Sequence, residues 1–504
     1  MALPSFFATT TLRTLAASTG AAEDDVRRLA EAVRGEIHVG ERASSLVSAR
    51  TFVEIFARTF GSLRILGSAA ATAELQARAR AVNPSIELGE QGPRALSVSF
   101  NATASAAIEY CAQGWWVGRG HRELEERAGQ APVGPMLAGI LAFNDLFRIG
   151  LDSVLQPLVP RPSPLASWSA LRWSARDPHE EDLAALPRLR SPTVALVGCG
   201  AIGHAFAFAI SHGPRIDARI DLVDPQPLSQ SNLQRYLGTT KNQADAREQK
   251  VGVCGRTLEP IFSGVRQHNL NWPGYRRRLR QQQESPTTPE IALVALDSAE
   301  DRRIIQGALP RLIINGWTRI AECGVTKHVL TDDTQCLSCT YLAVSSQKAA
   351  LNDVNQLINE LGLHAGRAVQ LLAGASLDST DLRIIERQRG LPTSSLEAWR
   401  GESLRALYGE LCGMANIAVS EREMYTVPLP QVSALAGVLM AAEYTKVAAG
   451  LDIGTRPIEV STLQGPGDMW EQPPRRKSSH PAPCICKDPV YTAAYELKWS
   501  PQPT

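Results

Sequence analysis

A glycine-rich segment behind a short apolar stretch carries the clearest chemistry in this chain. Residues 193–197 are typical of a buried strand, and Gly198, Gly200 and Gly203 follow in a Gly-x-Gly-x-x-Gly pattern that enters a helix. Glycines at this spacing let backbone amides approach phosphate oxygens, and the helix N-terminus adds a favourable dipole. A second apolar stretch ends in Asp224, about 20 residues further on, where a carboxylate can hold ribose hydroxyls. The pattern predicts a nucleotide site.

Polar and basic residues after Asp224 favour a nucleoside triphosphate over a dinucleotide. Asn232, Arg235 and Lys250 follow the ribose carboxylate, where a nicotinamide dehydrogenase needs no cations. An enzyme that cleaves a triphosphate needs such cations to stabilise charge on the phosphates. Asp297 ends a further apolar stretch and is a candidate ligand for Mg²⁺, with a helix N-cap as the alternative role.

This series of motifs resembles the family of ThiF, MoeB and ubiquitin-activating enzymes. The similarity covers residues 190–330 and 425–490, and it includes a Pro430–Gly437 pattern that begins a late helix in that family. Gln226 and Tyr236 depart from the family pattern, which has an aspartate and a glutamine there. The resemblance implies an α/β, Rossmann-like adenylation fold that binds ATP and Mg²⁺.

The same resemblance implies a role for each polar residue. Asp224 would hold the ribose, and Asn232 would orient a phosphate or fix the turn. Arg235 and Lys250 would stabilise the triphosphate during attack at its α-phosphorus, and Asp297 would ligate Mg²⁺. Secondary candidates for the nucleotide are Lys241, Arg302 and, as an arginine supplied by the inactive half, Arg13.

Length and composition set broad bounds on the protein. A chain of 504 residues is too long for one core and suggests two or three domains. Lys and Arg (52) nearly balance Asp and Glu (51), so no basic excess points to nucleic acid. Apolar runs are of strand length, which predicts no membrane span. Nine cysteines, some closely spaced, favour a reducing cytoplasm with metal or catalytic thiols over a disulfide framework.

The N-terminal third resembles a degenerate copy of the second half. Pro135–Leu141 is similar to Ser433–Leu439, and Leu63–Ala69 is a candidate remnant of a first strand and glycine turn that lacks the polar series behind it. We therefore predict a tandem of a degenerate and an active adenylation domain. The predicted divisions are 1–165 (degenerate copy), 166–190 (linker), 191–330 (active domain, first part), 331–427 (insertion), 428–490 (active domain, last part) and 491–504 (tail).

Two cysteine pairs have the spacing of a zinc site. Cys336 and Cys339 form a CxxC pair, and Cys484 and Cys486 form a late CxC pair. Tetrahedral thiolate zinc needs two such pairs brought together, so we expect one structural zinc. The alternative is four thiols without a metal.

Cys412 is the candidate nucleophile. It follows a helical stretch inside the insertion, beside Gly413, and a thioester cysteine must be exposed and able to reach the adenylate. The resemblance supports this choice, because ubiquitin-activating enzymes carry their thioester cysteine in a comparable segment. Cys323, after a strand-like stretch, is the weaker alternative.

The resemblance implies ATP-dependent activation of a ubiquitin-like protein, followed by thioester transfer to Cys412 and then to a conjugating enzyme. The layout is similar to that of activating enzymes of bacterial antiphage operons of the Bil or CBASS type. Alternatives are a peptide-adenylating enzyme of the microcin-maturing type, a sulfur-carrier activator, and a scaffold or dinucleotide oxidoreductase. We expect a cytoplasmic protein that can form a homodimer and has no nucleic-acid or membrane partner.

Overall fold

The computed structural model contains two compact units. One comprises Met1–Tyr341 with Pro428–Thr504, and the other comprises Leu342–Val427. The residues that the structure describes are 15–16, 21–89, 95–102, 104–155, 167–282, 288–319, 321–341, 361–372, 375–401, 404, 407, 428–462, 470–471, 476–477 and 484–499. The glycine loop, the cations behind it and both cysteine pairs belong to the first unit.

The elements of the first unit fall into two series. The N-terminal series is α2 (Glu23–Ala32), β1 (Gly35–Val39), α3 (Ala43–Phe56), β2 (Ser62–Leu66), α4 (Ala69–Val82), β3 (Glu87–Leu88), β4 (Leu96–Phe100), β5 (Ile108–Gln113), β6 (Trp116–Arg119), α5 (Val133–Gly150), α6 (Asp152–Leu155), β7 (Ser167–Ser169) and α7 (Glu180–Leu183). The C-terminal series is β8 (Leu189–Arg190), β9 (Val194–Val197), α8 (Ala201–Ile210), β10 (Ile216–Val223), η1 (Gln230–Asn232), α9 (Lys241–Asp245), α10 (Lys250–Leu258), β11 (Phe262–His268), α11 (Trp272–Gln281), β12 (Ile291–Val294), α12 (Ala299–Gln306), β13 (Leu312–Thr318), β14 (Glu322–His328), α13 (Leu337–Thr340), α18 (Pro430–Ala448), β15 (Ile458–Ser461), β16 (Trp470–Glu471), η5 (Ile485–Lys487) and α19 (Pro489–Trp499).

The C-terminal series builds a mixed sheet whose central strands are parallel. Its order is β11-β10-β9-β12-β13-β14-β15-β16, with parallel pairing from β11 to β13 and antiparallel pairing beyond. β9 is buried at every position, as expected for a parallel strand covered on both faces. The chain order reverses between β9 and β12, and ligands of such sheets bind at the carboxyl ends of the strands beside this reversal. The predicted α/β architecture is therefore present.

The N-terminal series builds a separate sheet with a matching strand order. The order is β3-β2-β1-β4-β5-β6-β7, again parallel strands followed by antiparallel ones. Leu63–Leu66, expected to belong to a first strand, lies in the second strand, β2. The first strand is β1, in which buried and half-buried residues alternate, so its sequence lacks a continuous apolar run.

Residues 167–190, expected within a linker, contribute to both sheets. β7 pairs with β6 of the first sheet, and β8 pairs with β10 of the second. Trp168 and Trp173 hold this crossing in place because both rings are buried, with centroids 5.1 Å apart. The segment expected as a C-terminal tail also differs, since Pro489–Trp499 forms α19.

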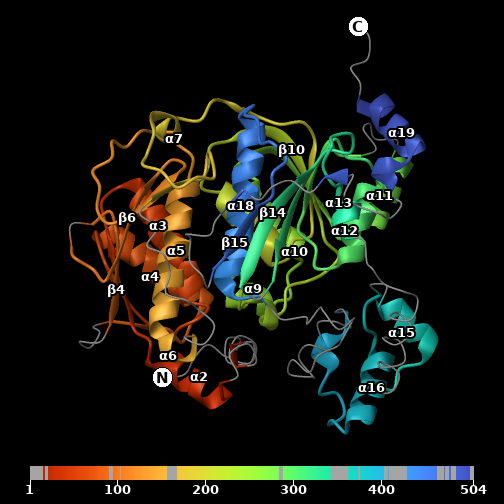
Figure 1. Cartoon of the computed structure of the whole chain (residues 1–504). Coiled ribbons are helices and arrows are strands. Elements are labelled where there is room, and N and C mark those ends of the chain that lie inside the picture. The colour runs from red at the N-terminus through yellow and green to blue at the C-terminus, as the bar shows by residue number, and fades with distance from the viewer. Residues whose placement is uncertain are drawn as a thin grey trace. The chain divides into compact units, whose positions relative to one another are not determined.

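The long helices α5 and α18 pack against each other between the two sheets (Figure 1). Each also crosses a neighbouring helix at a glycine. A Cβ at Gly139 of α5 would lie 2.4 Å from the carbonyl oxygen of Ser48 in α3, and one at Gly437 of α18 would lie 2.3 Å from Cβ of Ala205 in α8. The similar Leu-Ala-Gly sequences thus serve the same close approach in both halves. Among the described residues, no helix combines the length and the apolar character needed to cross a lipid bilayer.

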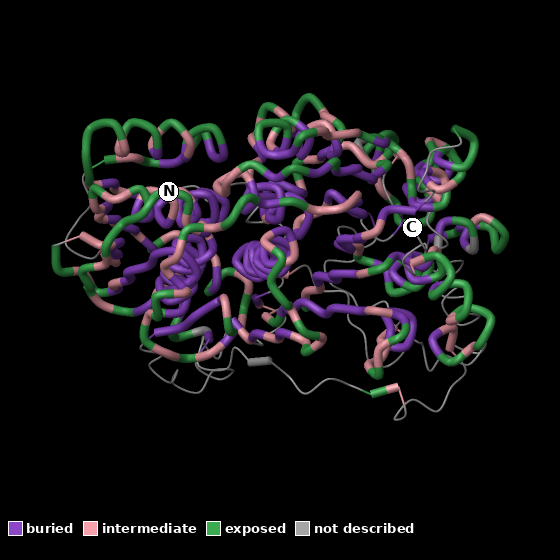
Figure 2. Tube along the Cα trace, turned by 90° about the horizontal axis from the view of Figure 1, so that it is seen from above, coloured by how far each residue is buried: buried purple, intermediate pink, exposed green. Residues whose placement is uncertain are grey.

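The two halves share one hydrophobic core. A single cluster of buried apolar side chains extends from the N-terminal strands through α5 and α18 into the second sheet, and Figure 2 shows buried residues throughout this interior. Polar contacts also cross the boundary: Trp173 Nε1 donates to Glu443 Oε1 at 2.7 Å, and Asn144 Nδ2 donates to the Thr462 carbonyl at 2.6 Å. The halves therefore fold as one unit.

Glu443 is the centre of a buried charge cluster. Its carboxylate binds Lys327 Nζ at 2.8 Å and Lys446 Nζ at 2.7 Å, and it is fully buried. We expect Glu443→Gln to lower the free energy of unfolding by about 3–5 kcal/mol, because it leaves two buried ammonium groups without their counter-charge. Urea unfolding measures this. Glu322→Gln, at an exposed ion pair, is the control and should change stability by at most about 0.5 kcal/mol.

The same carboxylate gives the stability a defined pH dependence. Burial alone would raise the pKa of Glu443, but Lys446 and Lys327 more than offset this and hold the pKa below its usual range. Its stabilisation is therefore complete above the unfolded value of about 4.3 and is lost as pH falls through the lower folded value. Glu443→Gln should flatten the acid side of the stability curve, and an unchanged acid limb would contradict this assignment.

The described part of the second unit is helical. It contains α15 (Ala365–Leu372), α16 (Ser379–Arg389) and η2 (Glu397–Trp399), packed around leucine and isoleucine side chains. Arg367 pairs with Asp381 at 2.7 Å and ties α15 to α16. Cys412 lies outside the described residues, so its role stays a prediction.

Candidate active site

The glycine loop between β9 and α8 depends on the absence of side chains. Gly198 has φ +95°, and a Cβ there would lie 2.5 Å from the carbonyl oxygen of Ala295. A Cβ at Gly203 would lie 2.3 Å from the Gly198 carbonyl oxygen, so the third glycine lets α8 pack back onto the loop. Gly200 precedes the first turn of α8, whose amides are available to an anion.

Asp224 fixes the loop to the end of β10. Its Oδ2 accepts from the Cys199 amide at 2.8 Å, and its Oδ1 accepts from the Gln226 amide at 2.8 Å. Asp224 is only 7% exposed. In this structure the carboxylate predicted for the ribose shapes the glycine loop and the turn after β10, at the carboxyl edge of the sheet.

Lys250 and Arg235 meet at one aromatic ring. Lys250 Nζ lies 5.5 Å and Arg235 Cζ 5.6 Å from the centre of the Tyr236 ring, and both cations lie over that ring. Lys250 is buried, and its Nζ donates to Gln226 Oε1 at 2.8 Å. Tyr236 also reaches the glycine loop, because a Cβ at Gly200 would lie 3.5 Å from its hydroxyl oxygen. The structure thus brings together the glycine loop and both predicted cations.

Gln226 and Tyr236 are site residues that the motif comparison did not select. They are the two positions where this chain departs from the family pattern. Both departures contact Lys250, one through a hydrogen bond and one through the ring face. The signal in the sequence that could have identified Gln226 and Tyr236 is that the chain departs from the family pattern at these two positions.

Asp297 follows the end of β12 and is close enough to Arg235 for its charge to act on the guanidinium group. Burial lowers the pKa of Arg235, while Tyr236 and the negative charge of Asp297 act in the opposite direction. Asp297 is exposed, and the N-cap of α12 is Ser298, whose side chain accepts from the Asp301 amide at 3.3 Å. The capping role considered for Asp297 is therefore wrong, and its carboxylate remains available to a hard cation.

The other polar candidates have structural partners. Asn232 fixes the turn, because its Oδ1 accepts from the Ser229 amide at 3.0 Å. Buried Arg302 donates to the Gly316 carbonyl at 2.8 Å and also to Leu296 and Asn315, so it supports the strand ends. Lys241 pairs with Asp245 at 2.5 Å on α9. Arg13 lies outside the described residues.

The two cysteine pairs converge. Sγ of Cys336 lies 3.5 Å from that of Cys484, Sγ of Cys339 lies 3.3 Å from that of Cys486, and all four sulfurs lie within 4.8 Å of one another. A zinc ion with bonds of about 2.3 Å would separate tetrahedral sulfurs by about 3.8 Å. The four thiols therefore fit a structural zinc, which they would hold as thiolates.

Cys323 does not have the setting of a nucleophile. It lies within β14 between two paired strands and is fully buried. Burial raises the pKa of its thiol well above the usual value, and thiolate is the reactive form.

With this geometry established, comparison with known proteins identifies the family. The chain belongs to the ThiF family, whose sequence pattern matches residues 177–483. "Uncharacterized protein y4jF" of Sinorhizobium fredii (strain NBRC 101917 / NGR234) is 29% identical over 475 residues, which cover 89% of this chain and 87% of that protein.

Similar solved structures include two of MccB from E. coli. MccB with ATP is 15% identical with a TM-score of 0.37, and the match covers 68% of this chain and 81% of that chain. MccB with AMPCPP and SeMet MccA is 17% identical with a TM-score of 0.34, and the match covers 57% of this chain and 65% of that chain.

Proposed function

We propose that this protein is an ATP-dependent adenylating enzyme. The observation that carries the proposal is the convergence of Arg235 and Lys250 over Tyr236, beside the glycine loop at the carboxyl edge of the sheet. Two cations beside amides that can bind phosphate suit a triphosphate, on which charge develops during cleavage. A dinucleotide oxidoreductase does not require this pair of cations, and a non-catalytic scaffold has no need of two cations beside a glycine loop.

The proposed first step joins a carboxylate to the α-phosphate of ATP. A carboxylate oxygen attacks the α-phosphorus, the bond from that phosphorus to the bridging oxygen breaks, and pyrophosphate leaves with the electron pair. The product is an acyl-adenylate, in which AMP is the leaving group for the next step. Arg235 and Lys250 would stabilise the negative charge on the phosphate oxygens. Asp297 would hold Mg²⁺, which neutralises phosphate charge when bound.

We further propose that the carboxylate is the C-terminus of a ubiquitin-like protein. The thiolate of Cys412 would attack the carbonyl carbon of the adenylate, expel AMP and carry the acyl group as a thioester to a conjugating enzyme. Two observations support Cys412 as the nucleophile. The alternative, Cys323, is buried, and Cys412 belongs to a compact unit separate from the one that holds the glycine loop. The alternative is adenylation of a peptide or a sulfur carrier with no thioester step.

The N-terminal half fits an inactive copy of the adenylation domain. Its strand order and its helix crossing at Gly139 match those of the C-terminal half. Where β10 is followed by Asp224, however, β2 is followed by Gly67 and Ser68, which offer no carboxylate for a ribose. We propose a tandem in which only the C-terminal copy binds ATP.

Pyrophosphate exchange tests the adenylation step. Purified protein with Mg²⁺, ATP and labelled pyrophosphate should form labelled ATP when a carrier is added, and the carriers to try are small β-grasp proteins or short peptides encoded beside the gene. Conjugating-enzyme and deubiquitinase-like genes in the same neighbourhood would favour the ubiquitin-like substrate and an antiphage operon. Binding of NAD without any binding of ATP would overturn the proposal.

Cys412→Ala separates the two substrate classes. With a ubiquitin-like carrier, this variant should retain pyrophosphate exchange but lose the thiol-sensitive adduct between carrier and enzyme on a non-reducing gel, because only the second step needs a thiolate. Cys323→Ala is the matched control and should keep the adduct. If wild type releases adenylate and forms no adduct, the peptide or sulfur-carrier alternative replaces the thioester step.

A further inference from the structure

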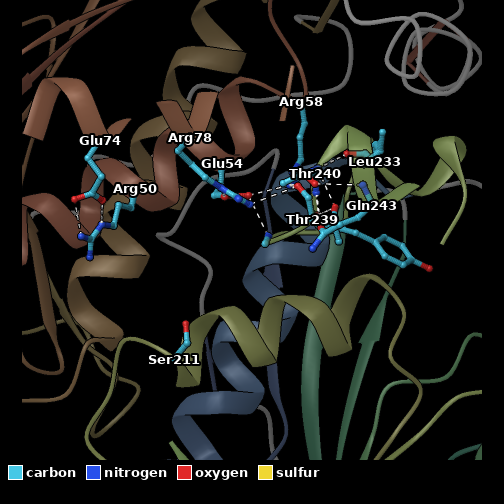
Figure 3. Close-up of polar contacts among 12 residues, drawn as sticks. Arg50, Glu54, Arg58, Glu74, Arg78, Ser211, Leu233, Thr239, Thr240 and Gln243 are labelled. Carbon is cyan, nitrogen blue, oxygen red and sulfur yellow. Dashed lines mark hydrogen bonds and ion pairs between the residues drawn. The ribbon is translucent and has the colours of Figure 1, made fainter. Parts of the chain in front are cut away.

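A buried ionic cluster lies where the N-terminal half meets the segment that carries Arg235 (Figure 3). Glu54 belongs to α3, Arg58 follows the end of that helix, and Arg78 belongs to α4. The Arg58 and Glu54 side chains are 0% and 1% exposed, and Arg58 Nη2 lies 2.9 Å from Glu54 Oε2. Arg78 binds the other carboxylate oxygen of Glu54. Burying these charges is costly unless each is paired and its remaining polar atoms are hydrogen-bonded.

The cluster fixes both ends of the segment from Leu233 to Thr239. Arg58 Nη1 donates to the Leu233 carbonyl at 2.7 Å, and Arg58 Nη2 donates to the Thr239 carbonyl at 2.9 Å. Glu54 Oε2 accepts from the Gly238 amide at 3.1 Å. This short segment is therefore attached to the N-terminal half at three backbone positions. Each of the three hydrogen bonds involves a charged side chain, and such bonds are stronger than neutral ones.

Arg235 and Tyr236 lie inside the attached segment. The Thr239 hydroxyl donates to the Tyr236 carbonyl at 2.6 Å, which links the Thr239 end to the aromatic residue under both cations. Both terminal nitrogens of Arg58 are bonded to groups of the protein itself, so Arg58 acts on the segment and does not have the position of a phosphate ligand. Arg58 is therefore connected to Arg235 by one hydrogen bond, to the Leu233 carbonyl, and by the two peptide bonds from Leu233 to Arg235.

The charges of the cluster persist at neutral pH. Burial alone would raise the pKa of Glu54, but Arg78 and Arg58 more than offset it and hold the value at about 2. Glu54 is thus an anion under any physiological condition, and the attachment does not depend on pH in that range.

We propose that the N-terminal half positions Arg235 for the nucleotide through Glu54 and Arg58. This inference rests on the proposed adenylation site. It gives the N-terminal half a function, which is to hold Arg235 of the C-terminal half in position. Glu54 and Arg58 are positioning residues, and Arg235 is the group expected to touch ATP.

The first test is binding of Mg·ATP, measured by titration calorimetry on the full chain. Arg58→Ala should weaken binding about tenfold or more, as Arg235→Ala should, because each removes one correctly placed charged donor. The double variant should bind no more weakly than Arg235→Ala alone, since Arg58 acts through Arg235. Arg50→Ala is the matched control: Arg50 also lies on α3 and pairs with Glu74 on α4, but in an exposed bridge away from the segment (Figure 3). Additive losses, or wild-type affinity in Arg58→Ala, would overturn the proposal.

The second test is hydrogen exchange, which needs no substrate. The Gly238 amide and its neighbours should exchange faster in Arg58→Ala than in wild type or Arg50→Ala, and Arg58→Lys should restore part of the protection. If Arg58→Ala does not fold, the partly exposed Arg78→Met tests the same cluster. Unchanged exchange at Gly238 in variants that fold would sink the inference. Wild type that binds Mg·ATP but never catalyses pyrophosphate exchange would instead sink the adenylation proposal, so the two failures are distinguishable.

Discussion

Lys250→Ala should reduce carrier-dependent pyrophosphate exchange by about 10²–10³-fold, because it removes a preorganised positive charge from the site proposed for the phosphates. Lys250 is 3% exposed and is held by Gln226 and the face of Tyr236, so its ammonium group is already placed before ATP arrives. Initial rates at saturating ATP measure the loss in kcat. Arg235→Ala should cause a loss of similar size.

The matched control for this experiment lies on the same helix. Arg256 is an exposed cation of α10 that pairs with Glu248, and Arg256→Ala should leave exchange unchanged. If Lys250→Ala raises only the KM for ATP and keeps kcat, Lys250 contributes equally to ground state and transition state. Wild-type exchange in Lys250→Ala would show that the phosphates bind elsewhere.

Removal of metal from the four-cysteine cluster is expected to have the largest effect on stability. Gently purified protein should contain about one zinc per chain, and Cys339→Ser should abolish it, because a tetrahedral site has no spare ligand. Binding of structural zinc contributes roughly 10 kcal/mol or more to folding in small domains. In this chain we expect the loss to concentrate around α19, which packs beside the cluster and donates from Trp499 Nε1 to the Leu309 carbonyl at 2.9 Å.

Elemental analysis and limited proteolysis test this expectation together. Chelation or Cys339→Ser should expose residues 484–499 to protease, while Lys487→Ala, beside the cluster but without a thiol, should keep both zinc and resistance. Wild-type protein with four reactive thiols and no zinc would contradict the assignment. ATP affinity should change much less, because no cysteine of the cluster contacts the described glycine loop or its cations.

The residue types of the site could be predicted from the sequence, but the contacts between them could not. In the pattern Gly198-x-Gly200-x-x-Gly203, a Cβ at the first or the third glycine would collide with a backbone carbonyl oxygen. Because this steric limit applies to any loop of this kind, the pattern identifies the loop without a structure. Cysteine spacing likewise predicted that the four thiols come together, since two short pairs are typical of a shared site. Gln226 and Tyr236 were noted only as departures, because a contact with Lys250 depends on how the turn after β10 folds.

The remaining features could not be predicted because they depend on contacts between residues that lie far apart in the sequence. Arg58 has the sequence context of an ordinary solvated cation near a helix end, yet it binds a carbonyl 175 residues further along the chain. In β1, Glu36 and His38 alternate with buried residues and mask a central strand, which is why the first strand was expected one position too late. The crossing from 167 to 190 contains prolines and polar residues, so its strand pairing depends on partners that the local sequence does not reveal.

The shared core restricts how this protein can be divided. Helix α18 buries nearly all of its residues, and part of that surface packs on α5 of the other half. A gene fragment that encodes only the half with the glycine loop would leave this helix with an apolar side facing water, and we expect its product to aggregate or to require the missing half as a separate chain. The N-terminal half therefore supplies a surface that α18 needs in order to be buried, so we expect its deletion to be far more damaging than substitutions at its exposed positions.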